Sequence, residues 1–287
     1  MLLSRVGYIR PSSLPEAVQA LRAHENARVL AGGQTMINVM KTRFASPDVV
    51  VDLADVPGLA SIEARAGGAW TLGSMVTYDT IDHSDTVRGA RAVLGEVATV
   101  IADQQVRNRG TIGGNICASD PTNHFPPVTV ALGASMTIVG ADGERTVDAT
   151  DFFVGVYMTA VEPGEVLTGI SIPAPASNQG DAFEAITVGT EGTCIVNVAV
   201  SLLCNGRIED AHVVLGCVSA TPVRATGVEE ALNGSAPTPQ NIDAAMSGLA
   251  VSLDPPGDVH ASAEYRSHLA EVVTRRAVTA AVGKAVS

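Results

Sequence analysis

Two glycine pairs limit the folds open to this chain more than any other part of its sequence. The first is Ala31-Gly32-Gly33-Gln34-Thr35 and the second is Gly110-Thr111-Ile112-Gly113-Gly114-Asn115. Glycine lets backbone N–H groups approach a ligand closely and turn inward as an anion-binding nest. One such loop often only ends a strand, but two in one domain indicate a ligand with two phosphates, such as a dinucleotide. Neither loop has the G-x-G-x-x-G fingerprint or the lysine of a P-loop.

The first glycine pair lies inside a predicted βαβ unit. Residues 28–31 and 49–53 are predicted as short buried strands. Between them a helix from about Thr35 to Phe44 carries Met36, Val39 and Met40 at helical spacing. The Gly32-Gly33 turn therefore precedes a helix N-terminus, where N–H groups and the helix dipole favour phosphate.

Hydrophobic periodicity and turn signals predict the remaining elements. Predicted helices cover about 14–24, 78–83, 89–102, 126–133, 228–232, 241–249 and 263–282; predicted strands cover 69–73, 135–140, 144–147, 166–172, 182–188, 195–204 and 211–218. The first of these helices opens on the capping box Ser13-Leu14-Pro15-Glu16. Asn205-Gly206 predicts a hairpin between the last two strands. After residue 176 the chain is thus predicted to form a small antiparallel sheet backed by helices.

The bulk composition excludes several classes of function. The chain has 287 residues, is 46% hydrophobic and carries a formal net charge of −12. Such an acidic chain lacks the basic footprint of a nucleic-acid-binding protein and is disfavoured at an anionic membrane surface. No apolar run reaches the ~20 residues of a membrane-spanning helix, so no membrane span is expected. Residues 1–10 lack the apolar core of a signal peptide, which favours a cytoplasmic location.

The four cysteines, Cys117, Cys194, Cys204 and Cys217, form no C-x-x-C pair. Their spacing argues against a structural zinc site or an iron–sulfur cluster in this chain. Buried, reduced thiols within strands are the favoured interpretation. Cys117 stands out because it lies just past the second glycine loop. The sequence spacing indicates neither a Cys/His or Ser/His/Asp triad nor an acid–base pair of carboxylates, so no catalytic residue is predicted.

The second glycine loop, in its longer setting, resembles one known family. Residues 101–115 read IADQQVRNRGTIGGN, and Asp120-Pro121 follows at the expected distance. Supporting similarities lie in Ala31–Thr35, Met40-Lys41-Thr42-Arg43, Phe152, Gly155, Thr159, Glu165-Val166-Leu167, Tyr265-Arg266 and Arg275-Arg276-Ala277. In these residues the chain resembles the FAD-binding medium subunit of molybdenum hydroxylases, the family of aerobic carbon monoxide dehydrogenase and xanthine dehydrogenase.

The resemblance implies an α+β fold in two domains. Residues 1–176 would form the FAD-binding domain, with a small βαβ subdomain at about 1–58 and a larger mixed α/β subdomain with an antiparallel sheet at about 59–176. Residues 177–287 would form a C-terminal domain of the carbon monoxide dehydrogenase flavoprotein type, an antiparallel sheet with helices. The linker chemistry of residues 173–178, which read PAPASN, favours the same boundary.

The resemblance also implies which residues contact FAD. In the family the two glycine loops hold the FAD pyrophosphate, the aspartate before the proline lies near the cofactor, and the leucine of a Glu-x-Leu segment lies on the flavin side. In this chain the implied contacts are Leu30, Ala31, Gly32, Gly33, Gln34, Thr35, Ile101, Gly110, Thr111, Ile112, Gly113, Gly114, Asn115, Asp120, His124 and Leu167.

Some of these residues have a second interpretation from the sequence alone. Asp120 could equally form an Asx turn before Pro121. Arg107 and Arg109 could neutralise the pyrophosphate or be exposed charges at a helix end. His124 could lie near the cofactor or be an ordinary surface or loop histidine.

The chain departs from the family pattern at three places. His124 stands where relatives usually carry an acidic residue. Phe183-Glu184-Ala185 replaces a Tyr-x-Lys strand, so the lysine is missing, and Glu191-Gly192-Thr193-Cys194 replaces a Gly-Asp-Tyr/Phe-Ala segment near the flavin ring. The pyrophosphate site is therefore expected to be intact, whereas the flavin potential and the electron acceptor are not implied.

The function that the resemblance implies is electron transfer. FAD on this chain would take electrons from 2Fe-2S clusters of a small subunit, which would receive them from molybdopterin-bound molybdenum on a large subunit. The implied assembly is a dimer of heterotrimers. Two alternatives stay open: a self-contained flavin reductase on the same fold, and a scaffold or assembly factor without flavin. The molybdenum subunit sets the substrate, so carbon monoxide, a purine, a nicotine-like heterocycle and an aldehyde all fit the sequence.

Overall fold

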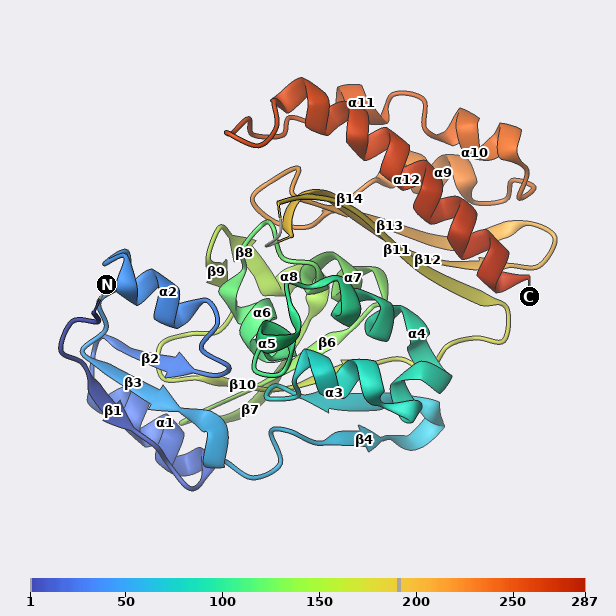
Figure 1. The fold of residues 1–287 in the computed structure, drawn as a ribbon. Helices are drawn as coiled ribbons and strands as arrows, with labels where there is room; N and C mark the ends of the chain where they lie inside the picture. Colours follow the sequence, from blue (N-terminus) through green and yellow to red (C-terminus); the bar gives the residue numbers. More distant parts are fainter. Residues whose placement is uncertain (1, 190–191, 287) are drawn as a thin grey trace.

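Three sheets of three to five strands follow one another along the chain, and a fourth, two-stranded sheet pairs Phe153–Gly155 with Met158–Thr159 (Figure 1). The structure, a computed structural model, describes residues 2–189 and 192–286. A three-stranded parallel sheet comes first, a five-stranded antiparallel sheet second and a four-stranded antiparallel sheet third. This arrangement confirms the predicted α+β class, with a small βαβ unit, a mixed α/β part and a C-terminal antiparallel sheet with helices.

The small parallel sheet contains the predicted βαβ unit. Its elements are β1 (Gly7–Ile9), α1 (Leu14–Ala23), β2 (Ala27–Leu30), α2 (Met36–Lys41) and β3 (Val49–Asp52), followed by the 3-10 helix η1 (Leu53–Asp55). The strand order is β1-β3-β2, with β3 buried in the middle. The sequence analysis missed β1, because its three residues are largely exposed and show no apolar run.

The middle part is built on the sheet β4-β5-β10-β6-β7. Its elements are β4 (Ile62–Ala64), η2 (Ala66–Gly68), β5 (Trp70–Gly73), α3 (Tyr78–His83), α4 (Asp85–Val100), α5 (Gln104–Arg107), α6 (Ile112–Ala118), α7 (Phe125–Ala131), β6 (Ser135–Gly140), β7 (Gly143–Asp148), α8 (Ala149–Phe152), β8 (Phe153–Gly155), β9 (Met158–Thr159) and β10 (Val166–Ile172). The hairpin of β6 and β7 and the strand β10 match their predictions. The second glycine loop was predicted as a loop only, whereas most of it is the first turn of α6.

The C-terminal part is the sheet β11-β12-β13-β14 with its helices. Its elements are β11 (Gln179–Val188), β12 (Thr193–Cys204), β13 (Ile208–Gly216), β14 (Val223–Arg224), α9 (Thr226–Leu232), α10 (Pro239–Ala245), α11 (Leu249–Ser252) and α12 (Ala263–Ala285). The predicted hairpin turn is confirmed, with Gly206 at φ 75°. The helix predicted over 241–249 is instead two helices, because Gly248 takes φ 84° between them.

The central strand β12 is buried on both faces. Val198, Val200 and Leu202 face the core beneath α12, while Ala199 belongs to the core of the middle part. Figure 1 places α9 to α12 on one face of this sheet and α4 and α7 on the other. The C-terminal sheet is thereby the middle layer between two sets of helices, which explains the near-continuous apolar run of its sequence.

Among the helices of residues 2–189 and 192–286, none combines the length and the apolar character needed to cross a membrane.

Candidate functional site

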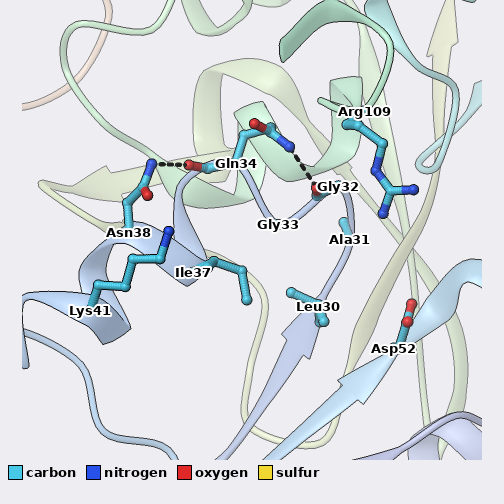
Figure 2. A pocket seen from close by; sticks show the side chains of 10 residues that line it. All are labelled: Leu30, Ala31, Gly32, Gly33, Gln34, Ile37, Asn38, Lys41, Asp52 and Arg109. Atoms are coloured by element: carbon cyan, nitrogen blue, oxygen red, sulfur yellow. Dashed lines mark hydrogen bonds between the residues drawn. The ribbon is translucent and has the colours of Figure 1, made fainter. Parts of the chain in front are cut away.

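The first glycine loop joins the end of β2 to the start of α2. Gly33 has φ 76°, a left-handed conformation that lets the chain reverse direction without strain. Gln34 folds back, and its Nε2 donates to the carbonyl oxygen of Gly32 at 3.1 Å. Asn38 Nδ2 donates to the Gln34 carbonyl oxygen at 2.8 Å and fixes the loop to the helix (Figure 2).

Three backbone amides of this loop are available to a ligand. Within the described residues, the N–H groups of Gly32, Gly33 and Gln34 donate no hydrogen bond to another group of the chain. Free amides around a glycine turn are the donors that bind a phosphate oxygen. The first loop therefore offers a set of free backbone amides.

A pocket of about 370 Å³ opens beside this loop (Figure 2). Its lining is Leu30, Ala31, Gly32, Gly33, Gln34, Ile37, Asn38, Lys41, Asp52 and Arg109. Lys41 and Arg109 border it from opposite sides, whereas Asp52 is its one carboxylate and accepts a hydrogen bond from the Tyr8 hydroxyl at 2.5 Å. Two cations and a set of free amides favour an anionic ligand there.

The second glycine loop is ordered by bonds within the chain. Thr111 Oγ1 accepts from the Gly114 amide at 3.1 Å and caps α6. The amides of Ile112 and Gly113 donate to the carbonyl oxygens of Val76 and Ser74, at 3.0 and 2.9 Å. These three amides are thus satisfied inside the protein, so the second loop is not the open nest of N–H groups that its glycines suggested.

The two loops are in direct contact. A side chain at Gly32 would collide with the carbonyl oxygen of Arg109, and a Cβ at Gly114 would lie 3.5 Å from that of Ala31. The glycines of the second loop are needed for packing in the same way, because a Cβ at Gly113 would lie 2.5 Å from the carbonyl oxygen of Ser74. Residues almost eighty positions apart in sequence therefore form one edge of the pocket.

Asn115 and Tyr78 lie beneath the second loop. Burial raises the pKa of Tyr78 to about 12, and its hydrogen bond with Asn115 opposes that rise. The Asn115 side chain is buried, and its Oδ1 has no partner among the described residues. A buried acceptor without a donor costs free energy, so this atom marks a place where a ligand or a water molecule would complete the site.

Arg107 and Arg109 have different roles: one arginine lines the pocket and the other bonds the end of a helix. Arg109 is exposed and lines the pocket. Arg107 instead donates through Nη1 to the carbonyl oxygens of Ile101 and Ala102, at 3.1 and 2.9 Å, and so satisfies the C-terminal end of α4. Only Arg109 is therefore placed to meet a ligand in this pocket.

Asp120 forms the Asx turn that the sequence allowed. Its Oδ1 accepts from the amide of Thr122 at 2.9 Å and from the hydroxyl of the same residue at 2.8 Å. Its charge also raises the pKa of Tyr157, which lies on the turn between β8 and β9. The carboxylate is half-buried and is not part of the lining of the pocket.

His124 is neither exposed nor on a surface loop, so the expectation of a surface histidine is wrong for this residue. It is 5% exposed at the N-cap of α7, and its ring lies 5.4 Å from that of Phe183. Its Nδ1 lies 3.5 Å from Asn197 Nδ2, and its Nε2 has no partner among the described residues. Packing of α7 onto β12 buries it.

The three departures from the family pattern meet in space around this histidine. Phe183 lies on β11, Cys194 is the second residue of β12, and His124 is close enough to lower the pKa of the Cys194 thiol. Glu191, from the third departure, lies outside the described residues. Sequence reasoning found each departure separately but not their proximity, which depends on how the third sheet packs on the middle part.

Three further predicted residues lie away from the pocket. Thr35 precedes α2 and is exposed, and Ile101 is half-buried at the end of α4. Leu167 is buried in the core of the middle part, paired with Ile138 across β10 and β6. Sequence reasoning in turn missed Asp52 as a lining residue; its position at the carboxyl end of a parallel strand was the available signal.

Comparison with known proteins gives two family matches that together span nearly the whole chain. Residues 4–175 match the FAD binding domain in molybdopterin dehydrogenase. Residues 181–281 match the CO dehydrogenase flavoprotein C-terminal domain.

Similar proteins are medium chains of multi-subunit dehydrogenases. The chain is 36% identical to the nicotine 6-hydroxylase medium subunit of Paenarthrobacter nicotinovorans, over 98% of this chain and 99% of that protein. It is 36% identical to the carbon monoxide dehydrogenase medium chain of Afipia carboxidovorans, over 99% of each. A solved structure of carbon monoxide dehydrogenase from Hydrogenophaga pseudoflava, which lacks the Mo-pyranopterin moiety of the molybdenum cofactor, superposes with a TM-score of 0.95 at 35% identity, over 99% of each chain. The chain therefore belongs to the family of FAD-binding medium chains that includes those of carbon monoxide dehydrogenase and related molybdenum hydroxylases.

Proposed function

We propose that this chain binds one FAD and passes electrons from the 2Fe-2S clusters of a partner chain to an external acceptor. The observation that carries the proposal is the contact between Gly32 and the backbone of Arg109, which makes the two glycine loops one site. When bound, FAD supplies the two-electron redox chemistry, and this chain binds and orients it.

The residues present fit a diphosphate. The free amides of Gly32, Gly33 and Gln34 can donate to phosphate oxygens, and Lys41 and Arg109 supply positive charge at the pocket. The second loop is not a nest of free amides, but Arg109, which directly precedes it, adds positive charge at the pocket for a second phosphate. This supports FAD rather than FMN.

The flavin end of the cofactor is proposed to extend toward Asp120 and His124. Asn115 Oδ1 and His124 Nε2 are buried atoms without partners among the described residues. Asn115 lies in the second loop, on α6, and His124 is the N-cap residue of α7. We also keep three residues of the family pattern as proposed contacts, although they lie away from the pocket: Thr35, Ile101 and the buried Leu167.

The proposed assembly has three kinds of chain. Relatives are medium subunits or medium chains, which implies large and small partners. We propose that the small one carries the 2Fe-2S clusters and the large one molybdopterin-bound molybdenum, that two heterotrimers pair, and that the complex is cytoplasmic. Within residues 2–189 and 192–286 no group of three or more His, Cys, Asp or Glu side chains is arranged to hold a metal ion.

We also propose the domain division given by the sequence, with residues 1–176 as the FAD-binding domain and 177–287 as the C-terminal domain. The two family matches leave residues 176–180 between them; β10 ends before that gap and β11 begins within it, at Gln179.

The decisive variants introduce a charge into each loop. Gly33→Asp and Gly114→Asp place a carboxylate where phosphate is proposed, and Gly33→Asn and Gly114→Asn are controls of nearly equal volume without the charge. Aspartate and asparagine tolerate the left-handed conformation of Gly33 better than most residues, and the close neighbour of Gly114 is only the Thr111 hydroxyl at 2.9 Å. All four variants are expected to fold.

The Asp variants should purify without FAD, while the Asn variants keep more of it, as measured by absorbance and by cofactor release. Stoichiometric FAD in both Asp variants would overturn the assignment of the loops. Oxidation of an organic substrate by the isolated, FAD-loaded chain would instead overturn the subunit role and favour a self-contained flavin enzyme.

A further inference from the structure

Two buried cysteines share one amide at the junction of the C-terminal sheet and the middle part. Asn197 Nδ2 lies 3.4 Å from the sulfur of Cys194 and 3.8 Å from the sulfur of Cys217. The Cys217 thiol is also in hydrogen-bonding contact with the Cys194 sulfur. These two cysteines with Asn197 and His124 are called the thiol cluster below. All four side chains are at most 5% exposed.

The fold brings the two thiols together by two local irregularities. The pairing of β11 with β12 shifts between Ile186 and Thr187, beside Cys194, and Ile195 and Val196 then both belong to the core under α12. Cys217 directly follows β13 and has φ 66°, a left-handed conformation that is uncommon for a residue other than glycine. Such conformations are enriched at functional sites.

Space for the cluster is left by a glycine. A Cβ at Gly216 would collide with Asn197 Oδ1, so glycine at this position allows the amide to lie between the two sulfurs. The amide also donates to the carbonyl oxygen of Asn123 at 3.2 Å, and the Cys217 amide donates to that of Pro121 at 3.1 Å. The cluster is thus attached to the 120–124 segment, beside the proposed cofactor site.

The pKa values of the two thiols are shifted in opposite directions. The hydrogen bond from Cys217 lowers the pKa of Cys194 to about 6 despite its burial, and His124 and Asn197 lower it further. The hydrogen bond with Cys194 raises the pKa of Cys217. The nearby Arg266 opposes this rise, and Asp120 adds to it. A thiolate beside a protonated thiol is the arrangement from which a disulfide forms.

Other uses of the cluster do not fit the geometry. In the described ranges, no group of three or more His, Cys, Asp or Glu side chains is placed to hold a metal ion. A substrate-cleaving Cys/His pair needs a cleft, yet the nearby cavity bordered by Asp120, Pro121 and Gly216 is only about 10 Å³. That volume holds about one water molecule, so a substrate does not fit there.

We infer that Cys194 and Cys217 are a redox-active dithiol that hydrogen peroxide converts to a disulfide. The Cys194 thiolate attacks one peroxide oxygen, takes up that oxygen as a sulfenic acid and, with one proton, releases one water molecule. The Cys217 thiol then attacks the sulfenic sulfur, forms the S–S bond and releases the second water. Two thiols lose two electrons and two protons, and one peroxide becomes two molecules of water.

This inference is independent of the proposed function, because it uses only the side chains of this chain. It also assigns the reactive thiol differently from the sequence, which singled out Cys117. That residue is half-buried on α6, a helix rather than a strand, and burial raises its pKa to about 12. Cys117 is therefore the internal reference for an unreactive thiol.

The test is peptide mapping of the purified chain after brief exposure to hydrogen peroxide, with remaining thiols blocked by iodoacetamide under denaturing conditions. The expected product is a cross-linked pair of peptides containing Cys194 and Cys217, formed roughly tenfold or more faster than any oxidation of Cys117. Cys217→Ser should convert this product to a sulfenic acid on Cys194, trapped by dimedone. Cys194→Ser should abolish both products.

Cys117→Ser and Cys204→Ser are the matched controls and should leave the cross-link unchanged. The wild-type map alone decides the question even if a cluster variant fails to fold. Absence of the Cys194–Cys217 cross-link in folded wild type, or faster oxidation of Cys117, would overturn the inference.

Discussion

At the scale of single residues, the glycines of the site have different structural roles. Gly33 is needed for its backbone conformation, whereas Gly32 and Gly113 are needed because another segment lies against their Cα atoms. Sequence patterns cannot separate these roles, since each glycine looks alike in a loop. The structure makes Gly32 the residue that holds the two loops at contact distance.

The variant Gly32→Ala tests that role. A single methyl group would meet the carbonyl oxygen of Arg109, a backbone atom that cannot rotate away, so the loops must separate. We expect a destabilisation of about 1–3 kcal/mol, typical of overpacking, and at least tenfold weaker FAD binding. Thermal unfolding and FAD titration measure the two effects.

Gly227→Ala is the matched control, because a Cβ at this helical position of α9 meets nothing within 4 Å. It should leave FAD binding unchanged and leave stability equal or higher by up to about 1 kcal/mol. If Gly32→Ala binds FAD as tightly as Gly227→Ala, the contact between the loops is not what forms the site.

At the scale of elements, local chemistry predicted most of the secondary structure. Ser13 caps α1 as expected, and the Glu16 carboxylate accepts from the amide of Ser12. Long runs such as β12 and α12 have enough periodicity to be found. Elements of two to four residues, such as β1, β9 and β14, were missed because tertiary pairing rather than local preference forms them.

The start of α12 depends on an anchor that periodicity cannot reveal. Arg266 is 3% exposed; it donates to the carbonyl oxygen of Ile195 at 2.5 Å and pairs with Asp258 at 2.6 Å. Backbone N–H groups of His260 and Ala261, together with Arg266, lower the pKa of Asp258 to about 2. The charged form of this carboxyl is therefore favoured by folding.

Because the folded pKa lies below the ordinary value of about 3.9, Asp258 should stabilise the fold above about pH 4 and lose that effect as the pH falls toward 2. Asp258→Asn should accordingly lower the unfolding temperature at pH 7 and approach wild type near pH 2. Asp254→Asn, at an exposed position in the same connection, is the control. If the unfolding temperature of Asp258→Asn stays below that of wild type by the same amount from pH 7 to 2, the stabilising role of the Asp258 charge is contradicted.

At the scale of the whole molecule, contacts between distant segments position the site. Arg91, 2% exposed on α4, pairs with Asp181 of β11 at 2.6 Å, and Asn197 reaches the 120–124 segment. These partners are 90 and 74 residues apart, so neither local pattern nor spacing could reveal them. The family resemblance predicted the overall arrangement of the fold. The burial of His124 and the thiol cluster instead follow from how the residues that depart from the family pattern pack in this chain.

The central claim, that the two loops together hold a diphosphate, is tested most directly by comparing FAD and FMN. Titration of the cofactor-free chain by calorimetry should give FAD binding at least a hundredfold tighter than FMN binding, a difference of about 2.8 kcal/mol. ADP should compete with FAD, because it presents the same two phosphates to Gly32, Gly33 and Arg109. Equal affinity for FMN and FAD, with no competition by ADP, would contradict the account.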